Sequence, residues 1–200
     1  FNDCDSLSSI EVADDNPIYD SRDNCNAIIE TATNQLLVGC KSTIIPNSIT
    51  RIGDAAFSDC SSLTSIAIPS SVTSIGDRAF SCCFSLTTIT ISNGVTNIGE
   101  HAFYECTSLK SITIPNSVTK IGRYAFAYCS SLTSITIPNS IISIENSTFY
   151  DCSSLRSITI PESVTTIEYY AFYNCTSLQS ITCKSETPPT IHNSTFENVS

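Results

Sequence analysis

The cysteines are the residues of this chain with the widest chemical range, because a thiolate can attack an electrophile, ligate a metal or enter a disulfide. The 200-residue sequence contains 11 of them. Six recur at one fixed interval, namely Cys60, Cys83, Cys106, Cys129, Cys152 and Cys175. Equivalent side chains in stacked repeats point the same way rather than toward one another, which disfavours disulfides between them. Cysteine is also among the most buried residue types, so we interpret this column as free, buried thiols.

Two further cysteines, Cys25 and Cys40, stand outside this column and are candidates for a disulfide. They lie symmetrically about a polar segment, residues 31–34, that separates two apolar runs and has the length of a hairpin turn. Opposite residues of antiparallel strands approach closely enough to be bridged. The sequence leaves both the bridged and the free form of Cys25 and Cys40 open.

Neither a metal centre nor a catalytic constellation is predicted. A structural zinc needs four convergent ligands, and the adjacent cysteines Cys82 and Cys83 direct their side chains apart. The sequence has 2 histidines, His101 and His192, and His101 has no serine or aspartate at a motif spacing. Glycine-rich phosphate loops and the GxSxG and HExxH motifs are absent from the sequence. We therefore expect a non-catalytic protein that uses no metal and no cofactor.

The tyrosines suggest binding rather than catalysis. Seven of the 8 tyrosines gather in one part of successive repeats, and they are Tyr104, Tyr124, Tyr128, Tyr150, Tyr169, Tyr170 and Tyr173. Exposed tyrosine is enriched at interfaces because it contributes a large contact area at low entropic cost. One interpretation is an aromatic binding patch, and the other is that the rings pack over the ledge between repeats.

These residues are positioned by a repeat of 23 residues. Leu63 and Leu86 lie 23 residues apart, as do Phe57 and Phe80, and the same columns continue to Leu178 and Phe172. Regular repetition at this length is typical of solenoids, in which each unit buries its apolar face against its neighbours. Without stacking, one such unit would bury too little surface to fold.

One unit is expected to contain three short elements. Residues 109–114 alternate apolar and polar side chains and predict a strand that ends at Pro115, because proline cannot donate to a β-ladder. A second, shorter extended segment is expected over residues 117–122, where Gly122 turns the chain. Residues 125–129 predict one helical or 3₁₀ turn with alanine, phenylalanine and cysteine pointing inward. The predicted fold class is thus an α/β solenoid with a parallel β-sheet of short strands on one side and short helical turns on the other.

The breaks in the repeat define the domain organisation. We expect one domain over residues 1–200, with a β-hairpin insertion at 13–39, regular repeats at 40–182 and an atypical last repeat at 183–200. Because the chain opens inside a repeat, we expect it to be part of a longer protein.

The outward side of the predicted strands is a second candidate binding surface. Its columns consist almost entirely of serine and threonine, and their central members are Ser111, Thr113, Ser134, Thr136, Ser157 and Thr159. Small hydroxyl and β-branched residues suit any solvent-facing ladder, which is the structural interpretation. The functional interpretation is a flat contact surface for a protein or a glycan.

Composition excludes two classes of partner. The formal net charge is -10, so the chain repels phosphate backbones and has no basic patch to release counterions. We therefore expect no nucleic-acid binding. The sequence also lacks an apolar run long enough to cross a bilayer, so no membrane insertion of these residues is predicted.

The segment I-P-N-S-V-T-K-I-G-R-Y-A-F-A-Y-C-S-S-L at residues 114–132 resembles the BspA-like leucine-rich repeats, a bacterial class with 23-residue units. This resemblance implies a right-handed, curved leucine-rich-repeat solenoid. It also implies a secreted or cell-surface location and adhesion to a host or neighbouring-cell protein or glycan. A structural spacer in a larger surface protein, or part of an enzyme whose catalytic domain lies elsewhere, is an alternative role.

Overall fold

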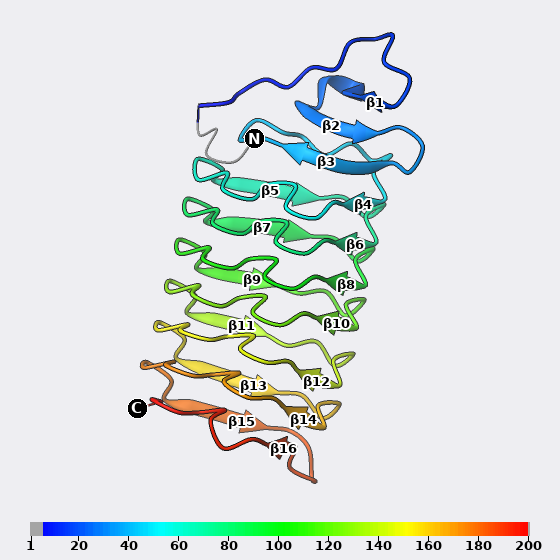
Figure 1. Ribbon diagram of the computed structural model, residues 1–200. Coiled ribbons are helices and arrows are strands. Elements are labelled where there is room, and N and C mark those ends of the chain that lie inside the picture. The colour runs from blue at the N-terminus through cyan, green and yellow to red at the C-terminus, as the bar shows by residue number, and fades with distance from the viewer. Residues whose placement is uncertain (1–5, 200) are drawn as a thin grey trace.

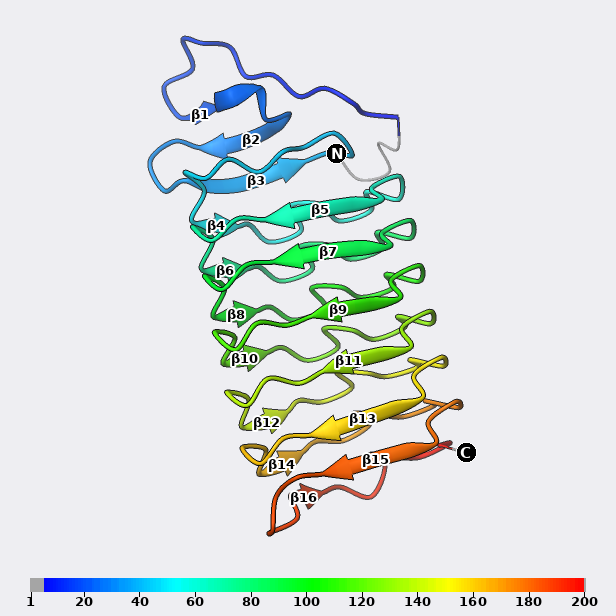
Figure 2. The same ribbon diagram turned by 180° about the vertical axis from the view of Figure 1, so that it is seen from behind.

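A computed structural model describes residues 6–199 as a stack of similar coils, in which the chain returns to the same place once per repeat (Figure 1). One side of the stack carries the long-strand column, and the other carries the short-strand column, as the reverse view also shows (Figure 2). The long-strand column comprises β5 (Ser65–Ile68), β7 (Thr88–Ile91), β9 (Ser111–Thr113), β11 (Ser134–Thr136), β13 (Ser157–Ile160) and β15 (Ser180–Cys183). The short-strand column comprises β4 (Arg51–Ile52), β6 (Ser74–Ile75), β8 (Asn97–Ile98), β10 (Lys120–Ile121), β12 (Ser143–Ile144), β14 (Thr166–Ile167) and β16 (Thr190–Ile191).

Pairing within both columns is parallel and joins equivalent residues of successive coils, although among residues 6–199 no ladder joins β10 to β12 or β11 to β13. Ile112 lies opposite Ile135, and Ile98 lies opposite Ile121. Identical side chains therefore stack along the axis, with the isoleucines buried between the two columns. This confirms the parallel β-solenoid, whereas the right-handed curvature implied by the resemblance stays a prediction.

A column of stacked phenylalanines fills the third side of the core. Consecutive rings from Phe57 to Phe196 have centroids 4.9–5.7 Å apart and lie within 15° of parallel. Phe80, Phe103 and Phe126 are fully buried. Since each such ring buries on the order of 150–250 Å² of apolar surface, this column is a main source of stability.

The segment beside the phenylalanine column is a sequence of tight turns rather than a helix. Phe103 N donates to Ala125 O of the next coil at 2.8 Å, whereas Tyr104 N donates within its own coil to His101 O at 3.1 Å. Amides thus alternate between neighbouring coil and own coil, which leaves no continuous set of intrahelical bonds. The expectation of a helical or 3₁₀ turn on this side, and with it the α/β description, is therefore not confirmed.

This turn places two residues of each coil in the left-handed region of backbone conformation. In one coil they are His101, with φ 55°, and Glu105, with φ 57°. The glycines, by contrast, have no positive φ. Gly122 is required by close approach instead, because a Cβ there would lie 2.6 Å from Glu100 N of the preceding coil. The expectation that Gly122 supplies a turn conformation is thus corrected to one of coil-to-coil contact.

The cysteine column is part of the inter-coil bonding. Cys83 Sγ donates to Phe57 O at 3.1 Å, and the same carbonyl accepts the amide of Cys60 at 3.1 Å. The later cysteines of the column repeat this bond at 3.2 Å. Burial raises the pKa of Cys129 to about 12, so its thiol stays protonated and able to donate. The column consists of free thiols, as its spacing predicts.

The insertion caps one end of the stack. It contains β1 (Tyr19–Asp20), the 3₁₀ turn η1 (Arg22–Asn24), β2 (Ala27–Glu30) and β3 (Gln35–Gly39). β2 and β3 form an antiparallel hairpin, and β3 continues in parallel onto β4. The insertion is therefore joined to the short-strand column, above the regular coils (Figure 1).

Cys25 and Cys40 are both buried free thiols in this structure. Their symmetry about the turn is broken by an irregularity between Ile28 and Ile29, which shifts the strand register by one residue. The shifted register pairs Ala27 with Gly39, so its continuation sets Cys40 opposite Asn26 rather than Cys25. Cys40 Sγ accordingly donates to Asn26 O at 3.6 Å.

We predict that Cys25 and Cys40 both titrate as free thiols in the denatured, non-reduced protein, so that reductant releases no further thiol from this pair. The physical reason is the register shift, which removes Cys40 from the position opposite Cys25. A thiol-reactive chromophore counts the thiols before and after reduction. A count two lower before reduction would show a disulfide and contradict the expected result.

Adjacent alanines provide a test of the turn conformation. Ala55 is exposed with φ 54°, whereas Ala56 is buried and lies outside the left-handed region. A left-handed alanine costs about 1–2 kcal/mol and glycine loses about 0.5–1 kcal/mol in entropy. Ala55→Gly should therefore stabilise the protein by about 0.5 kcal/mol, while Ala56→Gly destabilises it by about 1 kcal/mol. Urea denaturation measures both, and equal losses for the two variants would contradict the turn geometry.

Candidate functional site

The most distinctive surface feature is a continuous row of aromatic side chains along the turn side of the stack. We call it the aromatic row, and in order of contact it consists of Tyr124, His101, Tyr104, Tyr128, Tyr150, Tyr173 and Tyr170. Neighbouring ring centroids lie 4.8–5.7 Å apart along its whole length. Six of the seven tyrosines predicted from the sequence thus form one surface.

The turns position these rings by directing every intervening side chain inward. Ala102, Phe103 and Cys106 are fully buried, whereas His101 and Tyr104 remain half-exposed between them. In this coil His101, Tyr104 and Glu105 therefore face outward. Since the coils stack in register, outward residues of successive coils come within ring-contact distance.

One gap in the row is filled by a neighbouring column. Tyr104 and Tyr150 occupy equivalent positions two coils apart, and the coil between them carries the buried Ala127 there. Tyr128 lies next to Ala127 and contacts both tyrosines, with centroid distances of 5.3 Å to each. The row therefore depends on two columns of the repeat, which the alignment of one column does not reveal.

Ring orientation determines what the aromatic row offers a partner. Tyr150 and Tyr173 are stacked at 4.8 Å and 14°, and His101 and Tyr124 are stacked at 4.8 Å and 9°. Stacking covers one face of each of these rings, and the tyrosines among them also carry ring edges and hydroxyl groups. Tyr170 is more open, with an exposed fraction of 42%.

Tyr169 is the seventh predicted tyrosine and lies outside the aromatic row. It is 47% exposed and stacks on His192 at a centroid distance of 4.0 Å. His192 Nε2 in turn lies 3.3 Å from Glu168 Oε2. Both histidines thus contact tyrosines, a role that the sequence analysis did not assign to them. The 23-residue spacing of His101 and Tyr124 is the signal that could have revealed the first of these contacts.

Burial changes the acid–base properties of three members of the row, and in Tyr150 it raises the pKa together with the neighbouring Tyr128 and Tyr173. Burial, together with the nearby Glu105 carboxylate, raises the pKa of Tyr104 to about 12. Burial and the positive charge of Arg78 lower the pKa of His101, against the opposing effect of Glu100 and Asp77. Tyr104 and His101 are therefore neutral near pH 7, so the central part of the row is uncharged.

The strand face forms the flat hydroxyl surface expected from its columns. Ser111, Thr113, Ser134, Thr136 and Ser157 are exposed, and Thr159 is half-exposed. Parallel pairing aligns Ser111 with Ser134 and Thr113 with Thr136, and the 23-residue repeat places Ser157 and Thr159 at the equivalent positions of the next coil. This surface has the geometry for hydrogen bonding, but it lacks the large anchor side chains of strong interfaces.

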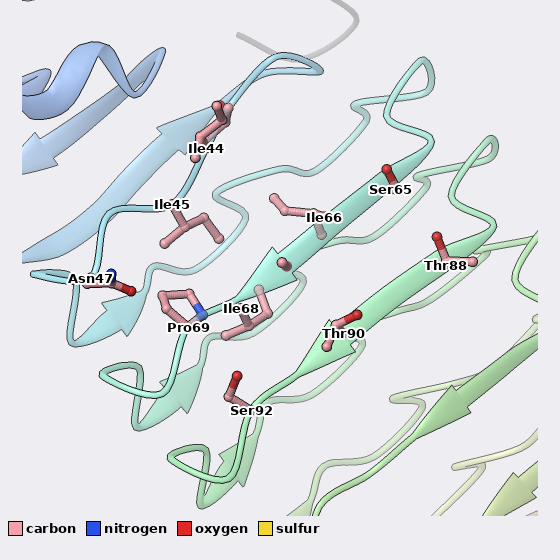
Figure 3. Close-up of a pocket in the computed structure, with 12 residues that line it drawn as sticks. Ile44, Ile45, Asn47, Ser65, Ile66, Ile68, Pro69, Thr88, Thr90 and Ser92 are labelled. Atoms are coloured by element: carbon pink, nitrogen blue, oxygen red, sulfur yellow. The ribbon is translucent and has the colours of Figure 1, made fainter.

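A groove interrupts the strand face at the insertion end. It has a volume of about 640 Å³ and lies between the segment 43–47 and strands β5 and β7 (Figure 3). Ile44, Ile45 and Asn47 lie on one side, and Ser65, Ile66 and Thr88 are among the residues of the other. Sequence analysis did not predict this groove, because it arises where the insertion meets the first regular coil.

Comparison with known families identifies the repeat. The model described as "BspA type Leucine rich repeat region" matches residues 28–132 and 119–200, with 6 copies. The chain belongs to this family. The 23-residue resemblance seen in the sequence is therefore confirmed, and no match is found among curated proteins.

Solved structures similar to this member of the family are bacterial leucine-rich repeat proteins. A Bacteroides ovatus leucine-rich repeat protein is 38% identical with a TM-score of 0.67, and the match covers 70% of this chain and 37% of that protein. The T. pallidum leucine-rich repeat protein is 26% identical with a TM-score of 0.74, covering 91% of this chain and 86% of that protein. A Eubacterium ventriosum leucine-rich repeat protein shares the fold at 23% identity and a TM-score of 0.69, with coverage of 99% and 54%.

Residues 6–199 contain neither a membrane-spanning helix nor a cluster of metal-ligating side chains. None of their helices has the length and apolar character needed to cross a membrane. No group of three or more histidine, cysteine, aspartate and glutamate side chains is arranged to hold a metal ion in the same part of the chain. The aromatic row, the strand face and the groove are candidate binding surfaces of this BspA-type domain.

His101 should make stability depend on pH in a defined direction. Its folded-state pKa is lowered, so the unfolded chain binds the proton more readily below the ordinary value of about 6.5. The contribution of neutral His101 to the free energy of unfolding should therefore be fully present above that value. It should be lost as the pH falls toward the folded-state pKa. His101→Gln should lose less stability than the natural chain between about pH 7.5 and about pH 5.5, where histidine titrates. Urea denaturation of both proteins at the two pH values measures the free energy of unfolding. Equal losses in the variant and the natural chain would contradict the lowered pKa of His101.

Proposed function

We propose that this chain is a non-catalytic recognition domain of a secreted or cell-surface protein, and that the aromatic row with Tyr169 binds a protein on a host or neighbouring cell. Family membership supports the surface context, since the implied role of such repeats is adhesion. The residues proposed to make contact are Tyr104, Tyr124, Tyr128, Tyr150, Tyr169, Tyr170 and Tyr173.

One observation carries this proposal: the tyrosines occupy positions that the fold does not require to be aromatic. In the first two regular coils the same columns hold Ala55, Ser58 and Arg78, yet the backbone bonds and phenylalanine stacking are the same. Ala55 and Arg78 also share the left-handed conformation of Tyr124 and Tyr170. Packing therefore does not explain why aromatic side chains concentrate toward the C-terminal coils.

Ring geometry favours a protein over a glycan as the partner. Sugar rings stack on open aromatic faces, whereas Tyr150 and Tyr173 cover one another's faces. Edges, hydroxyl groups and half-buried apolar area are what tyrosine contributes to protein interfaces. Tyr169 and Tyr170, the two exposed rings, provide the most accessible anchors.

The strand face supports a second candidate, in which its hydroxyl columns bind a glycan. The observation in its favour is the exposure of Ser111, Ser134 and Ser157 at equivalent positions of successive coils. A structural spacer, in which neither surface binds, is the remaining alternative.

The test is a comparison of two triple variants against panels of host extracellular proteins and glycans. Tyr169→Ser/Tyr170→Ser/Tyr173→Ser should weaken protein binding at least about tenfold, because interface anchors contribute about 2 kcal/mol or more each. Its melting temperature should change little, since these side chains lie outside the core. Ser111→Ala/Ser134→Ala/Ser157→Ala is the matched control and should bind normally.

The opposite result, loss only in the serine variant, would assign binding to the strand face and refute the aromatic row. Absence of any reproducible ligand for the natural chain would favour the spacer. Circular dichroism of both variants confirms that the coils remain folded.

A further inference from the structure

The long-strand column has an open edge at β5, next to the insertion. The sheet runs β11–β9–β7–β5, and β5 pairs with β7 alone. By sequence position the neighbour on the other side of β5 should be Thr43–Ile45, one repeat earlier than Ile66–Ile68. That segment forms no strand and no ladder with β5.

The insertion explains why the ladder stops there. Ile44 N donates to Cys25 O at 3.1 Å, and Thr43 Oγ1 donates to Asn26 O at 2.6 Å. Thr43 Oγ1 also accepts the amide of Cys40 at 2.7 Å. Segment 43–45 therefore makes its hydrogen bonds with the insertion instead of with β5. The groove of about 640 Å³ lies between this segment and β5 (Figure 3).

Backbone groups of β5 point into this groove. Ile68 O accepts Ser92 N at 3.3 Å, so the backbone groups of Ile66 and Ile68 face β7. Successive residues of a strand direct their backbone groups to opposite neighbours. The amide and carbonyl of Ala67 and the carbonyl of Ser65 consequently face the groove, where the described part of the chain supplies them with no ladder partner.

The lining of the groove restricts the chemistry of its occupant. All of its residues are uncharged, in a chain whose net charge is -10. Ile44 is 75% exposed at its rim and offers an apolar contact. The groove therefore matches an uncharged segment that supplies backbone donors and acceptors together with β-branched side chains, as each strand of this solenoid supplies to the next.

We propose that the groove binds an extended, uncharged peptide segment of a partner protein, which adds to β5 as a parallel strand. Ala67 N donates to the peptide, and Ala67 O and Ser65 O accept from it, in the register that β5 itself uses with β7. Ile44 covers the apolar side chain of the bound segment. This site is separate from the aromatic row, so it stands whether or not that row binds a partner.

The probe is a fluorescent peptide with the chain's own strand sequence, Thr-Ser-Ile-Thr-Ile-Pro-Asn, taken from residues 133–139. Ala67→Pro removes the one amide that the groove offers and leaves the bonds to β7 intact, because proline is tolerated at sheet edges. It should weaken peptide binding about tenfold, the equivalent of one lost hydrogen bond. Ala67→Thr is the matched control, since threonine occupies the same position in the next coils, and it should bind within about twofold, as the backbone bonds are kept.

Fluorescence anisotropy gives the affinities, and hydrogen exchange gives the location. Peptide should slow exchange of the Ala67 amide in the natural chain and in Tyr169→Ser/Tyr170→Ser/Tyr173→Ser alike. Equal affinity of Ala67→Pro and Ala67→Thr, with both folded, would overturn the proposal, as would protection confined to β15. A dimer of the chain alone that Ala67→Pro abolishes would identify a second copy as the occupant and equally overturn it.

Discussion

The hydrogen bonds between the turns of successive coils constrain the rest of this structure. His101, Phe103 and Glu105 donate their amides to Arg123, Ala125 and Ala127 of the next coil, each at 2.8–2.9 Å. The amides of alternate residues, such as Tyr104, donate to carbonyl groups of their own coil. This alternation fixes the register of the turns, because a residue inserted into a turn would exchange its inward and outward amides. The coil that ends at Phe196 is one residue longer between β15 and β16, yet its turn keeps the pattern, since Phe172 N donates to Thr195 O. The spacing of phenylalanine and cysteine in the regular coils follows from this register.

The same constraint separates structural positions from free ones. Inward positions hold stacked phenylalanines and hydrogen-bonded thiols, and glycines allow the coils to approach closely at Gly76 and Gly99. The left-handed positions of the turn accept different residues, since alanine, arginine, histidine and tyrosine all occur there. The fold therefore tolerates substitution along this edge. A row of contacting aromatic rings on such an edge is consistent with selection for recognition rather than for folding.

The sequence predicts the solenoid, its parallel strands and the buried cysteine column, because all three repeat with the same period. It does not predict the tight turns, since the run from Ala125 to Cys129 has the inward spacing of a helical turn. The outcome depends on the neighbouring coil, which takes every second amide. Likewise, the symmetry of Cys25 and Cys40 is a local pattern, whereas the register of β2 and β3 is set over the whole hairpin.

The candidate sites, too, are predicted where they follow from the repeat and are missed where they depend on contacts between segments far apart in the sequence. Six predicted tyrosines form one row because they lie on one edge, but their contacts cross columns through Tyr128 and include His101. The groove beside β5 has no sequence signature at all. It results from competition between the insertion and β5 for the segment around Ile44, which only three-dimensional hydrogen bonding resolves.

The most direct test of this account is measurement of scalar couplings across hydrogen bonds by NMR in the isotope-labelled chain. Couplings should join the amide nitrogen of Phe103 to the carbonyl carbon of Ala125, and that of Glu105 to Ala127, one coil away. Couplings confined to carbonyls three or four residues earlier in the same coil would show a helical turn and contradict the inter-coil bonding on which the account rests.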